Sequence, residues 1–127
     1  MATHFKELRV WQNAMDVAME VFELSKPFPD GERFSLTDQI RRSSRSVAAN
    51  ISEAWRKRRY QAAFVSKLSD AETEMAETQT WVEVAKRCGY WVNEVAEGLD
   101  SRCEEVIAQI SLMIRDAPSW CEGFQKR

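Results

Sequence analysis

Residues 61–88 read QAAFVSKLSDAETEMAETQTWVEVAKRC, and this stretch decides the fold. One set of mostly apolar residues in it repeats at alternating steps of four and three: Phe64, Leu68, Ala71, Met75, Thr78, Val82 and Ala85. Such a heptad seam lies on one face of an α-helix, and Thr78 is its one polar member. Gly89 then follows as a natural C-terminal residue for a helix. The pattern predicts a long helix over residues 61–88 that packs against other helices.

Three more segments have helical periodicity. Residues 8–26 carry an apolar stripe of Leu8, Trp11, Met15, Ala18 and Phe22, which Ala14 and Val21 widen. The sequence PFPDG at 27–31 ends the segment. Residues 36–58 follow a suitable N-cap at Ser35 or Thr37. Residues 93–116 start at Asn93, another suitable N-cap, and Pro118 ends them. Their seam consists of Leu99, Cys103, Val106, Ile110 and Met113.

These four segments predict an all-α protein. Amphipathic helices joined by connections of a few residues are typical of an up-down-up-down antiparallel four-helix bundle. The 127 residues are enough for one domain with a real core, so we expect residues 1–127 to form a single bundle. The helices are expected at about 8–26, 36–58, 61–88 and 93–116. Residues 117–127 show no clear period and are expected to form a tail after the fourth helix.

The second segment carries an unusual polar stripe. Arg42, Ser46, Asn50 and Glu53 are spaced i, i+4, i+8 and i+11, so they share one face of the helix. One interpretation is a structural polar network at a helix–helix seam, in which an arginine pairs with a carboxylate. The other is a set of ligand or nucleic-acid contacts.

Positive charge is also concentrated in this segment. Residues 36–59 hold seven basic and two acidic residues, a net charge of +5, whereas the whole chain has a net charge of −2. Residues 60–105 hold ten acidic and four basic residues. The basic residues Arg45, Arg56, Lys57, Arg58 and Arg59 are candidates for phosphate binding. The alternatives are solvated helix faces, favourable cations at a helix C-terminus, or pairing with the acidic segments.

Several classes of chemistry are not predicted. The only histidine is His4, which leaves neither a di-iron motif nor a histidine-activated nucleophile. There is no glycine-rich phosphate loop. We therefore expect no enzyme activity, no metal and no cofactor. Three cysteines without a C-x-x-C spacing, no signal-peptide core in MATHFKELRV and no long apolar run predict a cytoplasmic protein without a membrane partner.

Five tryptophans are many for a chain of this length. Each could be a core residue or could lie at a subunit interface, where aromatic residues are enriched. Because Trp55 and Trp81 fall outside the predicted seams, we favour an oligomer.

The order of these motifs resembles a known family. Residues 5–59 contain a series of short motifs in a fixed order. These are Leu8-Arg9-Val10-Trp11, Phe28-Pro29, Gln39-Ile40-Arg41-Arg42 and Asn50-Ile51-x-Glu53. This arrangement, over about residues 5–116, resembles the four-helix-bundle family of proteins encoded by intervening sequences of bacterial large-subunit ribosomal RNA genes. That family is similar in fold to the accessory variability proteins of diversity-generating retroelements.

The resemblance implies a homopentamer and, because the retroelement proteins bind nucleic acid through basic surfaces, binding of RNA or DNA. We expect a non-catalytic homo-oligomeric bundle that presents the basic second helix to nucleic acid. The competing interpretation is a structural or protein-interaction module in which that helix is used in contacts between subunits.

Overall fold

The computed structural model describes residues 2–125, and α-helices dominate them. The long helices are α1 (Arg9–Ser25), α2 (Leu36–Arg56), α3 (Gln61–Arg87) and α4 (Asn93–Arg115). A shorter helix, α5 (Ala117–Gln125), follows them. Two 3₁₀ turns, η1 (Phe5–Glu7) and η2 (Asp30–Glu32), precede α1 and α2. The described residues contain no strand, so the predicted all-α class is confirmed.

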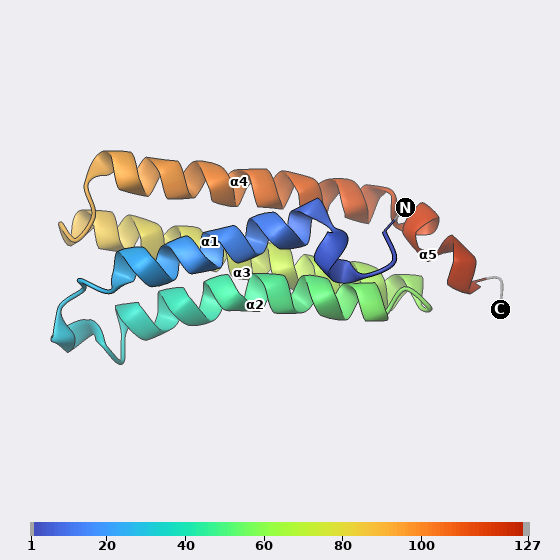
Figure 1. Cartoon of the computed structure of the whole chain (residues 1–127), viewed down its shortest axis with the longest axis horizontal. Coiled ribbons are helices and arrows are strands. Elements are labelled where there is room, and N and C mark those ends of the chain that lie inside the picture. Colours follow the sequence, from blue (N-terminus) through green and yellow to red (C-terminus); the bar gives the residue numbers. More distant parts are fainter. Residues whose placement is uncertain (1, 126–127) are drawn as a thin grey trace.

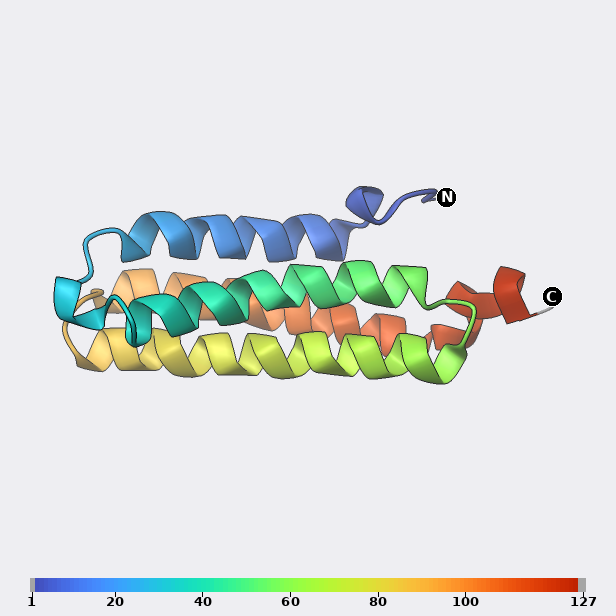
Figure 2. The ribbon, with the colours of Figure 1, turned by 90° about the horizontal axis from the view of Figure 1, so that it is seen from below.

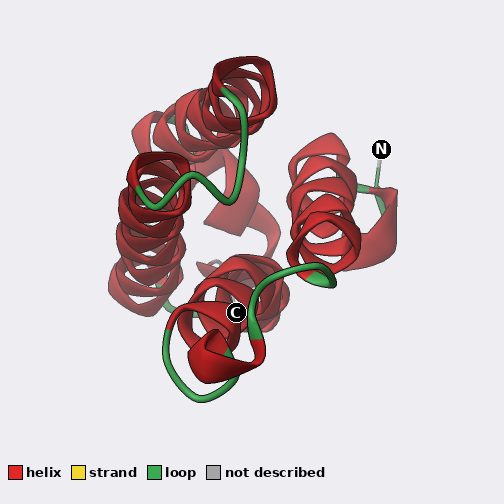
Figure 3. Cartoon of the chain, turned by 90° about the vertical axis from the view of Figure 1, so that its left-hand side faces the viewer, coloured by secondary structure: helices red, strands yellow, loops and turns green. Residues whose placement is uncertain are grey.

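The four long helices lie side by side, and the chain reverses direction at each connection between them (Figure 1, Figure 2). Helix α1 contacts α2 and α4, and α3 contacts the same two helices. Seen nearly along their axes, the helices surround a common interior (Figure 3). Helix α2 therefore lies between α1 and α3 and contacts both.

The predicted seams of α3 and α4 form the core. All seven seam positions of α3, including Thr78, are buried. The five seam positions of α4 are buried as well, together with Ala96. Burial of side chains of this size stabilises the folded state by roughly 1.5–3 kcal/mol each before the cost of ordering the chain.

The predicted stripe of α1 is confirmed in part. Ala14, Ala18 and Val21 of the stripe are buried, and so are Val10 and Val17 outside it. Trp11, Met15 and Phe22 are only half-buried. Small and β-branched side chains occupy the closest approach to the neighbouring helices, and the larger ones cover its edges. Trp11 gains a polar partner there, because its indole Nε1 donates to Ser52 Oγ at 3.1 Å.

Two helix ends differ in detail from the sequence prediction. Ser35 is at the N-cap position of α2, but its hydroxyl donates to Glu32 Oε1 at 2.6 Å instead of capping the helix. Asn93 is the first residue of α4, and Val92 occupies the N-cap. The predicted role of Gly89 is confirmed: its φ is 79°, and Tyr90 N–H bonds to Ala85 O at 3.0 Å in a Schellman-type end.

The tail has no clear period in the sequence, but its described part forms a helix, α5. Helix α4 ends at Arg115, before Pro118, as predicted. Pro118 is the second residue of α5, where its missing N–H costs nothing. Ala117 and Cys121 are buried, and Trp120 packs edge-on against Trp55 with ring centroids 6.4 Å apart. A helix of nine residues is too short for its period to be recognised in the sequence. Residues 126 and 127 of the predicted tail lie outside the described residues.

None of the helices in the described part of the chain is both long and apolar enough to span a lipid bilayer.

Candidate nucleic-acid interface

The predicted phosphate-binding residues form two separate groups along α2. Arg45 lies near the middle of the helix, and the other four, Arg56, Lys57, Arg58 and Arg59, lie at its C-terminal end and in the turn to α3. The eleven-residue spacing from Arg45 to Arg56 corresponds to about 16 Å along the axis. A ligand that touches both groups must therefore follow the helix for three turns.

The C-terminal group contains three free cations. Arg56 is the last residue of α2, Lys57 is its C-cap, and Arg59 follows in the turn. All three side chains are exposed, and among the described residues none forms an ion pair. These cations are favourably placed at the negative, C-terminal end of the helix dipole, and an anion from solvent can still reach them.

Arg58 is held in a different way. Its guanidinium carbon lies 3.4 Å from the centroid of the Trp55 ring and 4.6 Å from that of Phe124, and its Nε donates to Trp55 O at 2.8 Å. Burial lowers the pKa of Arg58 from its ordinary value. This side chain therefore joins the end of α2 to α5 and is less available to a ligand than its neighbours.

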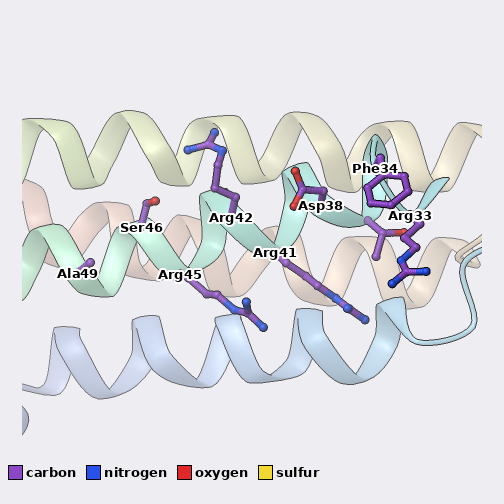
Figure 4. Close-up of a pocket in the computed structure, with 9 residues that line it drawn as sticks. Arg33, Phe34, Asp38, Arg41, Arg42, Arg45, Ser46 and Ala49 are labelled. Carbon is purple, nitrogen blue, oxygen red and sulfur yellow. The ribbon is translucent and has the colours of Figure 1, made fainter.

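A second basic surface lies around the first half of α2. It is an open hollow of about 620 Å³, and Figure 4 shows side chains that line it. Arg41 and Arg45 leave α2 on the side of α1, whereas Arg42 points to α3 (Figure 4). The lining residues are Arg33, Phe34, Thr37, Asp38, Arg41, Arg42, Arg45, Ser46 and Ala49. Four arginines and one aspartate line this hollow, so its lining residues have an excess of positive charge.

The arginines of the hollow differ in their partners. Arg42 forms ion pairs with Glu74, at 3.1 Å, and with Glu77, both on α3. Arg41 Nε donates to Ser25 Oγ at 2.8 Å, and its guanidinium carbon lies 4.8 Å from the centroid of the Phe22 ring. Arg45 is exposed, and no carboxylate among the described residues pairs with it. Arg45 is thus the freest cation that α2 contributes to the hollow.

The polar stripe lies along the edge of the α2–α3 contact. At one end Arg42 binds the two glutamates of α3, and at the other Glu53 pairs with Lys67 Nζ at 3.2 Å. Between them, Asn50 Nδ2 donates to the Ser46 carbonyl oxygen of the same helix at 2.9 Å. None of the four stripe residues is buried. Among the described residues, only the ends of the stripe form ion pairs with α3.

The buried polar contact between α2 and α3 is made by other residues. Ser43 Oγ and Thr78 Oγ1 are 2.8 Å apart, and both residues are fully buried. The sequence did contain a signal, since Ser43 lies three residues after Ile40 and four before Val47, the spacing of one buried helix face. The sequence alone does not indicate that Ser43 is a core residue, because its side chain is small and polar.

The described residues contain no group of three or more His, Cys, Asp or Glu side chains that could hold a metal ion. The three cysteines are free thiols: Cys88 is exposed, and Cys103 and Cys121 are buried. Burial raises the pKa of Cys103 to about 12, which keeps its thiol protonated near neutral pH.

Comparisons with known proteins give a matching family and similar solved structures. No curated protein matches the chain. A crystal structure of a protein of unknown function from the S23 ribosomal protein family, from Bacteroides thetaiotaomicron VPI-5482, has a TM-score of 0.75 and 29% sequence identity to the chain. The match covers 83% of this chain and 97% of that one. Residues 6–112 match the family described as 23S rRNA-intervening sequence protein. The chain therefore belongs to the 23S rRNA-intervening sequence protein family.

Proposed function

We propose that this protein is a non-catalytic homo-oligomer, a homopentamer of up-down-up-down four-helix bundles, that binds RNA or DNA through the cations of α2. One observation carries the proposal. Arg45, Arg56, Lys57 and Arg59 are exposed and have no acidic partner among the described residues, although α3 and α4 are rich in carboxylates. Cations left unpaired in this way are available to phosphates.

The charge distribution sets the expected strength of binding. The chain has a net charge of −2, and its acidic α3 and α4 repel a polyanion that approaches from their side. Only the face formed by α2 attracts it. We expect weak, salt-sensitive binding with little sequence preference, which repetition of the patch in an oligomer strengthens.

The test is a titration of fluorescently labelled structured RNA and duplex DNA, followed by anisotropy at several salt concentrations. The variant Arg56→Ala/Lys57→Ala/Arg59→Ala spares Arg58, because Arg58 packs against Trp55 and Phe124. If each removed cation contacts one phosphate, the slope of log affinity against log salt falls by roughly 0.7–0.9 units per residue.

A matched control removes three cations elsewhere. Lys6, Arg9 and Lys86 have no ion pair among the described residues and do not line the hollow. Their triple alanine variant changes the net charge equally and should keep most of the binding. No binding by the wild type at about 50 mM salt, or equal losses in the two variants, would refute a specific role for the α2 cations.

The alternative is a structural or protein-interaction module without nucleic-acid binding. Arg42 favours it, since this α2 arginine is already used to bind Glu74 and Glu77 of α3 within the chain. In the same way, the free cations would pair with carboxylates of another subunit. High salt would then dissociate the oligomer, as sedimentation can measure, and neither nucleic acid would bind.

A further inference from the structure

Phe34 is unusually exposed for an aromatic residue. Its relative exposure is 84%, the highest among the exposed large hydrophobic residues in the described part of the chain. It stands between η2 and α2 at the edge of the cationic hollow. The guanidinium carbon of Arg33 lies 5.3 Å from its ring centroid. Leaving a phenyl ring in water is unfavourable, so a ligand that covers the ring gains free energy.

The segment that presents Phe34 is held in place. On one side Arg33 N–H bonds to Asp30 O at 3.1 Å, and on the other Ser35 N–H bonds to Glu32 O at 3.0 Å. Glu32 is itself fixed, because its carboxylate accepts from the hydroxyls of Ser35 and Tyr90. The backbone that carries Phe34 is thus ordered before binding, which reduces the entropy lost when a ligand stacks on the phenyl ring.

The cations beside the ring have a regular spacing. Arg41 and Arg45 are one helical turn apart, about 6 Å along the axis, and both leave α2 on the same side (Figure 4). The ring contact and hydrogen bonds of Arg41 orient its guanidinium. Arg45 has only a longer contact, its guanidinium carbon 5.8 Å from the centroid of the Phe22 ring, and no carboxylate partner among the described residues. Together with Arg33 they can contact successive phosphates of one strand.

We propose that this hollow binds single-stranded nucleic acid, with one base stacked on Phe34 and the flanking phosphates on Arg33, Arg41 and Arg45. This inference rests on the proposed function and names its ligand class. An aromatic side chain can stack on a base only where that base has left its duplex, so Phe34 selects against double strands. Asp38, in the same hollow, repels phosphate but can accept a hydrogen bond from a base amino group.

The experiment compares a labelled ten-nucleotide oligo(dT) or oligo(U) with a blunt DNA duplex at about 50 mM salt. Phe34→Ala should weaken single-strand binding roughly tenfold and leave duplex binding within about twofold, since the stacking contact is lost and the charge is kept. Phe34→Tyr retains a ring and should bind like the wild type. Tyr60→Ala is the matched control, because Tyr60 is also exposed, at 65%, and does not line the hollow.

The possible outcomes separate this inference from the proposed function. If the wild type binds neither ligand, both fail. If it binds strand and duplex equally and Phe34→Ala changes nothing, nucleic-acid binding stands and the stacking site is refuted. If Phe34→Ala lowers the sedimenting mass of the protein, the ring belongs to a contact with a second copy, and that also overturns the inference.

Discussion

At the scale of the residue, Glu32 shows how one side chain joins two connections of the bundle. Its carboxylate accepts hydrogen bonds from the Ser35 hydroxyl and, at 2.8 Å, from the Tyr90 hydroxyl. Ser35 belongs to the connection that precedes α2, and Tyr90 to the connection between α3 and α4. The bonds from Ser35 and Tyr90 lower the pKa of Glu32 below its ordinary value of 4.5.

This shift predicts a pH-dependent effect of Tyr90→Phe. Because the pKa of Glu32 is lower in the folded state, the stabilisation is present above about pH 4.5 and is lost as the pH falls and the carboxylate takes up a proton. Tyr90→Phe should therefore lower the melting temperature at pH 7, and the difference from the wild type should shrink by pH 3. Tyr60→Phe is the control, since Tyr60 is exposed and its hydroxyl has no partner among the described residues. Equal effects of Tyr90→Phe at both pH values would contradict this account.

At the scale of the element, the α2–α3 contact depends on the pair Ser43 and Thr78. Each hydroxyl has a carbonyl of its own helix as an alternative acceptor for its single proton, Ile40 O at 3.4 Å for Ser43 and Glu74 O at 3.0 Å for Thr78. A partner lost by substitution therefore does not leave the other hydroxyl unsatisfied. We expect Ser43→Ala and Thr78→Val each to lower the free energy of unfolding by about 0.5–1.5 kcal/mol.

The double variant tests whether this bond couples the two helices. It should cost less than the two single variants together, because the second substitution removes a bond that the first has already broken. Urea unfolding of the four proteins measures the difference. Strict additivity would mean that the hydroxyls act only within their own helices.

The helices could be predicted from the sequence because their seams are long. The twenty-seven residues of α3 repeat the heptad often enough to define both its length and its buried face. The outer face of α1 was harder, since Trp11, Met15 and Phe22 are as apolar as the valines that the core actually buries. For the candidate site, the sequence shows which residues are charged but not which of them are free to bind a ligand. Whether an arginine of α2 is paired depends on which carboxylates α3 brings close to it. The exposure of Phe34 could not be predicted either, because a phenylalanine looks like a core residue in the sequence alone.

At the scale of the whole molecule, the five tryptophans all have partners within the chain. Trp55 packs against Trp120, and the indoles of Trp11, Trp81 and Trp91 each donate a hydrogen bond within the chain.

The outer face of α3 is a better candidate for a contact between subunits. It carries exposed small residues at steps of four and three, at Ala62, Ser66, Ser69, Thr73, Ala76 and Thr80. Small side chains at heptad spacing allow another helix to approach closely.

The last prediction is the assembly itself. Sedimentation equilibrium at micromolar concentration should give five times the chain mass of 14.7 kDa. If the outer face of α3 packs against a different face of the next copy, the contact repeats head to tail and closes as a ring. Ser69→Arg places a long charged side chain in that contact and should lower the sedimenting mass. Ser101→Arg makes the same change at an exposed position of α4 and should leave it unchanged. A monomeric wild type would refute the pentamer. A variant at Ser69 that keeps the full mass would instead place the contact on another face of the bundle.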